Sequence, residues 1–145
     1  MQNEERSEPR DSDPYQLACL AAGVGVWDWD LRSDEIYFSS LAREIQGLPP
    51  DEPATFATVR ALTHPDDAAG MLAALERALD PENRSQENYV YRITRPDTGE
   101  LRWVRAHGVA RFAEVEGKIQ AVHYSGSLED ITEREEMRRA LAESE

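Results

Sequence analysis

The stretch Tyr124-Ser-Gly-Ser-Leu-Glu-Asp-Ile-Thr-Glu-Arg-Glu135 marks the point where a strand-like segment ends and a helix begins. Thr132 and Glu135 have the spacing of a capping box, in which a hydroxyl and a carboxylate each bind one free backbone N–H of the first turn. After this start the helix over 131–145 has few apolar residues, namely Met137, Ala140, Leu141 and Ala142. These are too few to bury the helix against its own domain. The pattern therefore predicts an exit helix that connects a sensory or adaptor module to another part of a longer protein.

The composition predicts one globular domain that binds neither nucleic acid nor a membrane. The chain has 145 residues, of which 40% are hydrophobic, and this length suits a single core. Its formal net charge is −13 and its only lysine is Lys118, so it would repel nucleic acid and anionic lipid alike. No run approaches the roughly 18 apolar residues of a membrane helix, and the first residues contain no signal-peptide core.

The number of cysteines indicates the redox environment of the protein. Cys19 is the only cysteine, which excludes an intrachain disulfide, a CxxC redox pair and a cysteine zinc site. A single thiol fits a reducing environment. We therefore expect a cytoplasmic location.

Hydrophobic periodicity and turn residues predict an α+β fold. Residues 1–12 have almost no apolar content and are expected to form a disordered leader to a domain over 13–130. Helices are predicted over 13–22, 40–46, 55–62 and 65–80, and strands over 24–31, 35–39, 87–94, 101–112 and 118–128. This order describes a five-stranded antiparallel sheet with short helices on one face, an N-terminal helix and the C-terminal exit helix.

Short motifs occur in a fixed order along the chain. They are Trp27-Asp-Trp-Asp-Leu31, His64-Pro-Asp-Asp67, Tyr91-Arg-Ile93 with Arg95-Pro-Asp-Thr-Gly-Glu-Leu-Arg-Trp103, and Asp130-Ile-Thr-Glu-Arg-Glu135. Their order and spacing resemble those of PAS domains, of the subclass found beside bacterial histidine kinases and diguanylate cyclases. The resemblance implies a signalling module that senses a ligand or a partner and acts on a covalently linked effector through the exit helix, usually as a homodimer.

The resemblance also implies roles for the residues at the start of the exit helix. Its signal-relay residues would be Asp130, Ile131, Thr132 and Glu135. In the family the Asp is often paired with a basic side chain of the sheet. In this chain we expect that partner to be Arg92 or Arg102.

The family's cofactors can be compared with the residues present. Flavin-binding light-sensing relatives use an Asn-Cys-Arg motif, whereas Cys19 lies in the first predicted helix. Haem-binding relatives commonly place a His on the long helix, and residues 65–80 contain none, although His107 and His123 lie on predicted strands. We therefore expect neither flavin nor haem, and no metal. A small organic ligand of unknown identity remains possible.

A pocket between the sheet and the helices would hold such a ligand. The candidates to line it are Trp27, Trp29, Phe38, Phe56, Leu62, Met71, Leu75, Tyr89, Tyr91 and Trp103. The same side chains could instead fill a small core, and this alternative is favoured because a small core needs their area. Trp103 and at least one of Trp27 and Trp29 are expected to be largely buried.

Two groups of polar residues could suggest catalysis or metal binding. Asp28 and Asp30 flank an aromatic residue, which can raise the pKa of a carboxyl, but the end of a strand explains them equally well. His64, Asp66 and Asp67 imitate a metal cluster, but all of them lie at one predicted helix start, where capping and the helix dipole explain them. We therefore assign no catalytic residue.

Three functions are consistent with these observations: a sensor domain that dimerises and moves an output helix, a constitutive interaction adaptor with a filled core, and a small α+β enzyme. The exit helix favours the first two, because an enzyme needs no polar helix that leaves its fold. A dimer would also cover the apolar residues of the first helix, Tyr15, Leu17 and Leu20, and the outer face of the sheet.

Overall fold

A computed structural model describes residues 14–144 and has the predicted α+β fold. The elements in chain order are α1 (Pro14–Ala21), β1 (Gly25–Asp30), β2 (Glu35–Phe38), α2 (Ser40–Gln46), α3 (Phe56–Leu62), α4 (Pro65–Leu79), β3 (Glu87–Thr94), β4 (Leu101–Val115), β5 (Lys118–Asp130) and α5 (Thr132–Glu143). The leader predicted over 1–12 and the first residue of the helix predicted over 13–22 lie outside the described residues.

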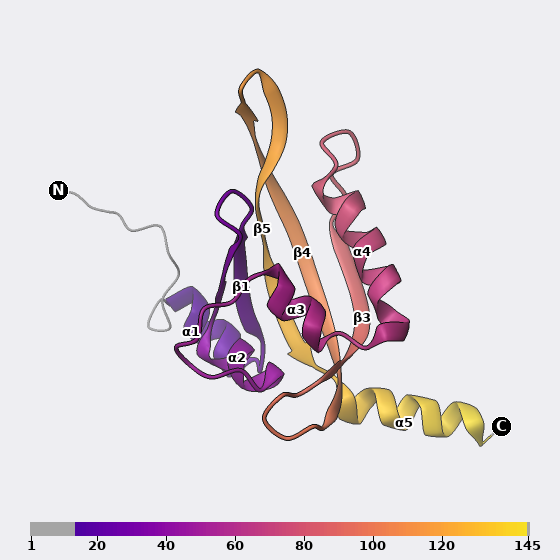
Figure 1. Ribbon diagram of the computed structural model, residues 1–145. Coiled ribbons are helices and arrows are strands. Elements are labelled where there is room, and N and C mark those ends of the chain that lie inside the picture. Colours follow the sequence, from indigo (N-terminus) through magenta and orange to yellow (C-terminus); the bar gives the residue numbers. More distant parts are fainter. Residues whose placement is uncertain (1–13, 145) are drawn as a thin grey trace.

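The five strands form one antiparallel sheet in the order β2-β1-β5-β4-β3 (Figure 1). The central pair, β4 and β5, continues past the other strands as a long hairpin. Its register shifts between Arg111 and Phe112, a bulge that bends the hairpin where it leaves the core. The outer position of β3 leaves backbone groups of this edge strand available to side chains from the helices.

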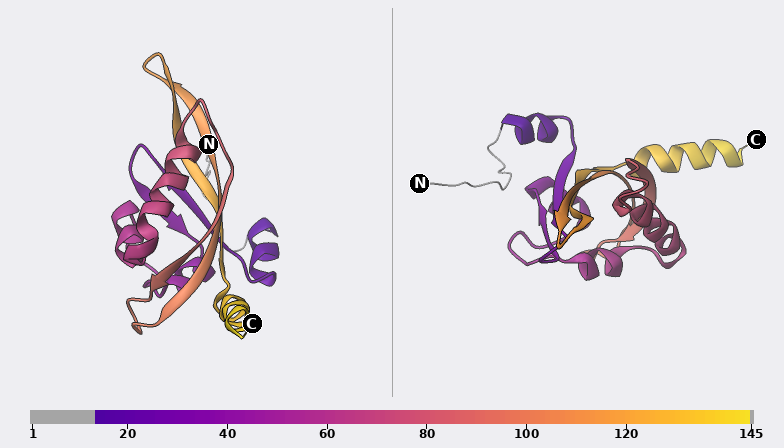
Figure 2. Two further views of the ribbon diagram at one scale, coloured as in Figure 1. Left: turned by 90° about the vertical axis from the view of Figure 1, so that its right-hand side faces the viewer. Right: turned by 90° about the horizontal axis from the view of Figure 1, so that it is seen from above.

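Helices lie on both sides of the sheet. Figure 2 shows α3 and α4 on one side, and α1 and α5 on the other. The core lies on the side of α3 and α4, where alternate residues of the strands face the helices. Its buried members include Trp27, Phe38, Ile45, Leu62, Tyr91, Ile93, Val104, Tyr124 and Leu128.

The short helices begin and end at the residues that the sequence marks. Ser39 precedes α2, and its hydroxyl accepts a hydrogen bond from the N–H of Ala42. Gly47 ends α2 in the left-handed conformation, at φ 74°. His64 precedes α4, and its Nδ1 accepts the N–H of Asp66 at 3.1 Å, so this histidine acts as a cap.

The capping box predicted for α5 is wrong. Thr132 is the first residue of the helix, and the hydroxyl that was expected to cap it bonds Trp103 and Asp130 instead. The carboxylate of Glu135 is taken by Arg138 and Arg139. Asp130 supplies the cap, because its Oδ1 accepts the N–H of Thr132 at 2.9 Å.

Candidate functional site

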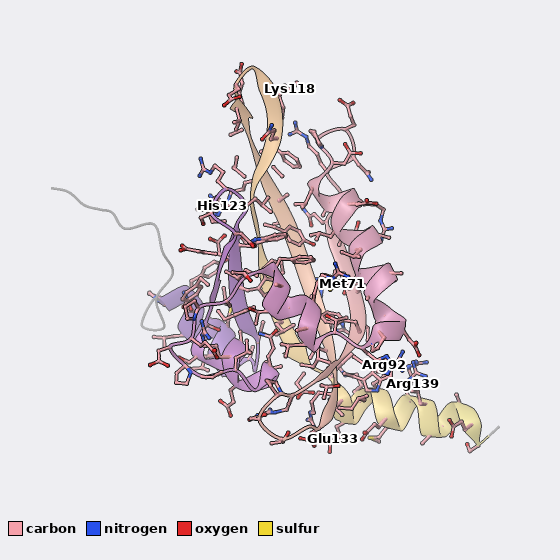
Figure 3. The ribbon with its side chains drawn as sticks, viewed as in Figure 1. Met71, Arg92, Lys118, His123, Glu133 and Arg139 are labelled. Carbon is pink, nitrogen blue, oxygen red and sulfur yellow. The ribbon has the colours of Figure 1, made fainter. Side chains whose placement is uncertain are left out.

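A cavity of about 60 Å³ lies between the sheet and helices α3 and α4. It is lined by aromatic and aliphatic side chains from every strand and from three helices: Trp27, Trp29, Ile36, Phe38, Gln46, Phe56, Val59, Met71, Leu75, Tyr89, Tyr91, Ala106, Tyr124 and Leu128. Met71 reaches this space from α4 (Figure 3). A cavity of this size has room for a few water molecules.

Most of the predicted lining residues meet at this cavity. They are Trp27, Trp29, Phe38, Phe56, Met71, Leu75, Tyr89 and Tyr91. Leu62 is buried in the same core but is not part of the lining. Trp103 lies elsewhere: it alternates with the buried Val104 and so faces the other side of the sheet.

The burial predicted for the tryptophans is right for Trp27 and wrong for Trp103. Trp27 is 9% exposed and lies against Tyr124, with ring centroids 5.0 Å apart. Trp103 is only partly buried, because the face of β4 on which it lies is covered by α5 and by arginine side chains rather than by the core.

Sequence reasoning missed six of the lining residues: Ile36, Gln46, Val59, Ala106, Tyr124 and Leu128. Tyr124 lies opposite Trp29 in the pairing of β1 with β5, so it shares the inner face with that residue. The alternation along β5 could have indicated this. Gln46 was not predicted because it is a polar residue at the end of a short helix. Its side chain is buried, and its Nε2 donates to the carbonyl of Ala42 at 3.0 Å.

Small residues in the middle of the sheet make room for these rings. A Cβ at Gly108 would collide with the ring and hydroxyl of Tyr124, and a Cβ at Gly126 would collide with the backbone carbonyl of His107 and come within 2.8 Å of Trp27 Cζ2. Glycine at both positions lets the two rings lie flat on the sheet. Trp27 also donates its indole N–H to the carbonyl of Ser127 at 2.9 Å, which fixes the ring.

The polar groups of the cavity are tyrosine hydroxyls and an amide. Burial raises the pKa of Tyr89 to about 12, and it raises the pKa of Tyr91 and Tyr124 as well, so all of these hydroxyls stay protonated at neutral pH. The hydroxyl of Tyr124 is buried and has no hydrogen-bond partner within residues 14–144. No Asp, Glu, Lys, Arg, His or Cys side chain is among the described residues that line the cavity.

A cluster on the outer face of the sheet has serine, aspartate and histidine side chains but lacks the geometry of a hydrolase. Asp28 accepts a hydrogen bond from Ser125 and lies 3.2 Å from Nδ1 of His123, with Arg111 at 3.6 Å. The carboxylate stands between the serine and the histidine, so the imidazole does not contact the hydroxyl that it would have to deprotonate. In the described part of the chain, no three His, Cys, Asp or Glu residues are grouped as metal ligands.

The start of α5 is fixed by hydrogen bonds to the sheet. Asp130 pairs with Arg102, one of the two predicted partners, at 3.0 Å. Thr132 Oγ1 accepts the N–H of Trp103 at 2.8 Å, and the N–H of Ile131 donates to the carbonyl of Trp103 at 2.9 Å. The first turn of the helix therefore moves with strand β4.

A second set of contacts joins α4 to α5 across the edge of the sheet. Asp67 of α4 pairs with the guanidinium of Arg92 at 2.8 and 3.0 Å and also accepts its backbone N–H at 2.8 Å. The Arg92 guanidinium lies 5.1 Å from the ring centroid of Trp103, and that of Arg139 lies 4.3 Å from it. Arg139 is held in turn by Glu135 at 3.1 Å. Figure 3 shows Arg92 and Arg139 close together where α5 begins.

These ion pairs also lower the pKa values of the carboxyl groups that take part in them. The hydrogen bond from Arg92 lowers the pKa of Asp67, and the hydrogen bond from Arg138 lowers that of Glu135. Both carboxylates are therefore ionised at neutral pH and balance the arginines around the indole.

Among residues 14–144, no helix is long and apolar enough to span a membrane.

The chain is similar to sensory proteins of bacteria. It is 33% identical over 133 residues to a blue-light-activated histidine kinase of Brucella anthropi, covering 86% of this chain and 24% of the relative. It is 29% identical over 128 residues to the sensor protein FixL of Bradyrhizobium diazoefficiens, covering 88% of this chain and 24% of that protein. The chain thus spans about a quarter of the length of these relatives.

A solved structure of a sensory box histidine kinase/response regulator from Burkholderia thailandensis has the same fold. It matches with a TM-score of 0.74 and 30% identity, and the match covers 91% of this chain and 95% of the other. A domain of nearly the same extent therefore occurs by itself in that structure.

These relatives correct the prediction that the chain holds neither flavin nor haem. One of them is activated by blue light, and protein side chains alone do not absorb in that range. The expectation was wrong because the missing motifs concern particular attachments, a thiol adduct and an iron ligand, whereas a cofactor can also be held without a covalent bond.

The family can be stated from these findings together. The model of the PAS fold matches residues 35–124, from the second strand to Tyr124 in the last strand. The matched region contains most of the cavity lining and both partners of the Asp67–Arg92 pair. This chain belongs to the PAS family, and the relatives that it matches at 30% identity or more are sensory histidine kinases.

Proposed function

We propose that this domain detects a ligand or chromophore in its cavity and passes the change through α5 to an effector domain of the same protein. The location would be cytoplasmic and the working unit a homodimer. The observation that carries this proposal is the double role of α4. This helix contributes Met71 and Leu75 to the cavity, and its Asp67 holds the Arg92 side chain that lies against Trp103.

The relay follows from these contacts. If an occupant of the cavity displaces α4, Asp67 moves with the helix and Arg92 must follow or lose its partner. Either change alters the stack of Arg92 and Arg139 on Trp103, and Arg139 belongs to α5. A bound group therefore changes the position of the exit helix. Asp130 and Thr132 accept hydrogen bonds from Arg102 and Trp103 of the sheet, and these bonds fix the start of α5, about which the helix would turn.

A ligand site is favoured over a filled core by Tyr124. A buried hydroxyl without a partner costs about 1–3 kcal/mol, and a completely filled core would leave no space for a guest or a water that could offset this cost. The constitutive adaptor with a filled core remains the second candidate, and it predicts no coupling between the cavity and α5.

The relatives point to a flavin or a haem as the kind of cofactor that the cavity would hold. The lining fits a flavin ring in its chemistry, because Trp29 and Phe56 offer stacking faces and the tyrosines offer hydroxyl donors. When bound, such a ring would supply absorption of visible light. The present volume of about 60 Å³ is too small for it, so α4 would have to move outward. The described lining has no histidine and no thiol for an adduct, and its side chains that could bond iron are Met71 and the tyrosines.

A homodimer is supported by apolar side chains on the helices that lie away from the cavity. On α1, Tyr15 is 81% exposed, and Leu17 and Leu20 are 50% and 51% exposed. Met137 and Leu141 of α5 are 69% and 66% exposed and lie one turn apart on the helix. A second copy of the chain would cover both groups at once.

The coupling can be tested by hydrogen exchange of the purified chain. Met71→Phe adds bulk beside the cavity, and it is expected to change the exchange rates of the amides of α5 by threefold or more. In a Trp103→Leu background, Met71→Phe should leave the exchange rates of α5 at the values found with Trp103→Leu alone. If Met71→Phe in the native background does not change the exchange rates of the α5 amides, the result would support the constitutive adaptor instead. Absorbance and mass spectra of the same preparation would report any cofactor that is retained.

A further inference from the structure

We propose, building on the function proposed above, that the cavity selects a neutral, planar aromatic ligand whose hydrogen-bond acceptor is bound by the hydroxyl of Tyr124. A carbonyl oxygen on an aromatic ring is the simplest group of this kind. The proposal stands on the unpartnered hydroxyl, the absence of charge in the lining, and the shape of the walls.

The hydroxyl of Tyr124 is available to donate a hydrogen bond to a guest. The residue is 3% exposed, its ring is fixed by Trp27 and by the space over Gly108, and its oxygen has no partner in the described chain. Burial and the nearby Tyr89 and Glu87 favour the protonated form. A buried O–H of this kind is best satisfied by a carbonyl or ether oxygen.

The lining excludes charged ligands. None of the described residues around the cavity carries a charge, and the polar groups are limited to Gln46, Tyr89, Tyr91 and Tyr124. A carboxylate, phosphate or ammonium group would lose its hydration without gaining a counter-ion, which is costly in an apolar site. The single acceptor should therefore be a neutral oxygen.

The walls favour a flat ring. Trp29 and Phe56 stack with an interplanar angle of 10° and a centroid distance of 5.1 Å, and Tyr89 and Tyr91 stack at 5.4 Å. Ala106 contributes a small side chain to the same lining. The cover consists partly of Met71 and Leu75, flexible side chains that can withdraw.

The size of the cavity limits the guest and links it to the relay. An engineered cavity that admits benzene has a volume of about 150 Å³, whereas this one has about 60 Å³. Even one ring must therefore displace the cover, and part of the cover belongs to α4. Entry of the ligand and movement of α4 are then one event.

The test uses three probes of similar shape. Acetophenone has a neutral carbonyl, α-methylstyrene replaces its oxygen by a methylene group, and benzoate carries a charge. Binding to the purified chain is measured by the shifts of the Met71 and Leu75 methyl groups in NMR titrations. We expect acetophenone to bind more tightly than α-methylstyrene, and benzoate to cause no shift at the same concentration.

The variant Tyr124→Phe removes only the hydroxyl. It should weaken acetophenone by about tenfold, the effect of one ordinary hydrogen bond, and leave α-methylstyrene unchanged. Tyr15→Phe, on the exposed face of α1, is the matched control and should change neither affinity.

The outcomes separate the ligand class from the sensory function. Equal binding of acetophenone and α-methylstyrene, unaffected by Tyr124→Phe, would refute the donor role while leaving the cavity as a ligand site. Preferential binding of benzoate would refute the neutral class. If no probe shifts the methyl groups at millimolar concentration, the ligand class is refuted, and the hydrogen-exchange test with Met71→Phe decides the sensory function independently.

Discussion

The guanidinium of Arg139 lies 4.3 Å from the ring centroid of Trp103, so a residue of the exit helix rests on a residue of the central sheet. Arg92 lies against the same indole at 5.1 Å. Each cation–π contact contributes about 0.5–1 kcal/mol at an exposed site and more when water is excluded. Trp103 is therefore the contact point through which α5 meets the domain.

Replacing Trp103 with Leu should loosen α5 without unfolding the domain. The substitution keeps an apolar side chain but removes the π face that both arginines use. We expect the α5 amides after the first turn to exchange about 5- to 20-fold faster, corresponding to the loss of about 1–2 kcal/mol. Hydrogen exchange read by mass spectrometry measures this directly. Phe112→Leu, which removes the ring that the Arg84 guanidinium faces at 4.4 Å on the β4–β5 hairpin, is the matched control and should leave α5 unchanged; equal loosening of α5 in both variants would contradict the assigned role.

Replacing Asp130 with Ala should disconnect output more than it destabilises the fold. The carboxylate caps α5 and pairs with Arg102, so its loss should cost about 1–2 kcal/mol, measured by urea unfolding. In a fusion of this domain to a histidine kinase or diguanylate cyclase, regulated output should fall sharply. The control is Glu100→Ala, which removes the other carboxylate paired with Arg102 and leaves the cap of α5 in place. Regulation of unchanged amplitude in the Asp130→Ala fusion would mean that the junction is only a tether.

The Asp67–Arg92 pair should make stability depend on acid. Arg92 lowers the pKa of Asp67 in the folded state from the ordinary value of 3.8, so the contribution of the pair is present above pH 3.8 and is lost as the pH falls through the lowered pKa. Asp67→Asn should cost about 1–2 kcal/mol at pH 7. The difference between the two proteins should shrink below pH 3.8. Urea unfolding from pH 3 to pH 7 checks this, with Asp66→Asn as the control; a difference that stays constant with pH would argue against the pair.

The apolar side chains of α1 should control self-association. Leu17→Glu and Leu20→Glu place charges on exposed positions of this helix and should convert a dimer to a monomer at micromolar concentration. Light scattering coupled to size exclusion gives the mass of each form. Ile119→Glu near the tip of the β4–β5 hairpin, also an exposed apolar position, should leave the mass unchanged. Native protein that is already monomeric at high concentration would exclude the dimer.

Much of the fold could be predicted from the sequence because its signals are local. The limits of α2 and β3 agree with the prediction, since Gly47 ends the helix and the alternation of β3 is regular. β4 and β5 are longer than predicted. The extra residues of β4 lie in the hairpin beyond the core, where hydrogen bonds between strands persist without a buried face to mark them. The extra residues of β5 lie at its other end, where Glu129 and Asp130 still pair with Arg105 and Val104 of β4.

The site was harder to predict because it depends on which residues meet across the sheet. Trp103 has the composition of a core residue, but the alternation of β4 sends it to the face that α5 covers. The unpaired hydroxyl of Tyr124 depends on Gly108, a residue on another strand. The partner of Thr132 likewise lies on β4, so the local spacing to Glu135 was misleading.

The small residues at the centre of the sheet have a consequence for how such domains diversify. Because the Cα of Gly108 lies under the Tyr124 ring, one added methyl group there would tilt the ring into the cavity. The hydrogen bonds between β3, β4 and β5 are made by the backbone and would survive the exchange. A lineage could therefore retune which molecule it recognises by single-carbon steps on one strand, while the scaffold and the exit helix are inherited unchanged.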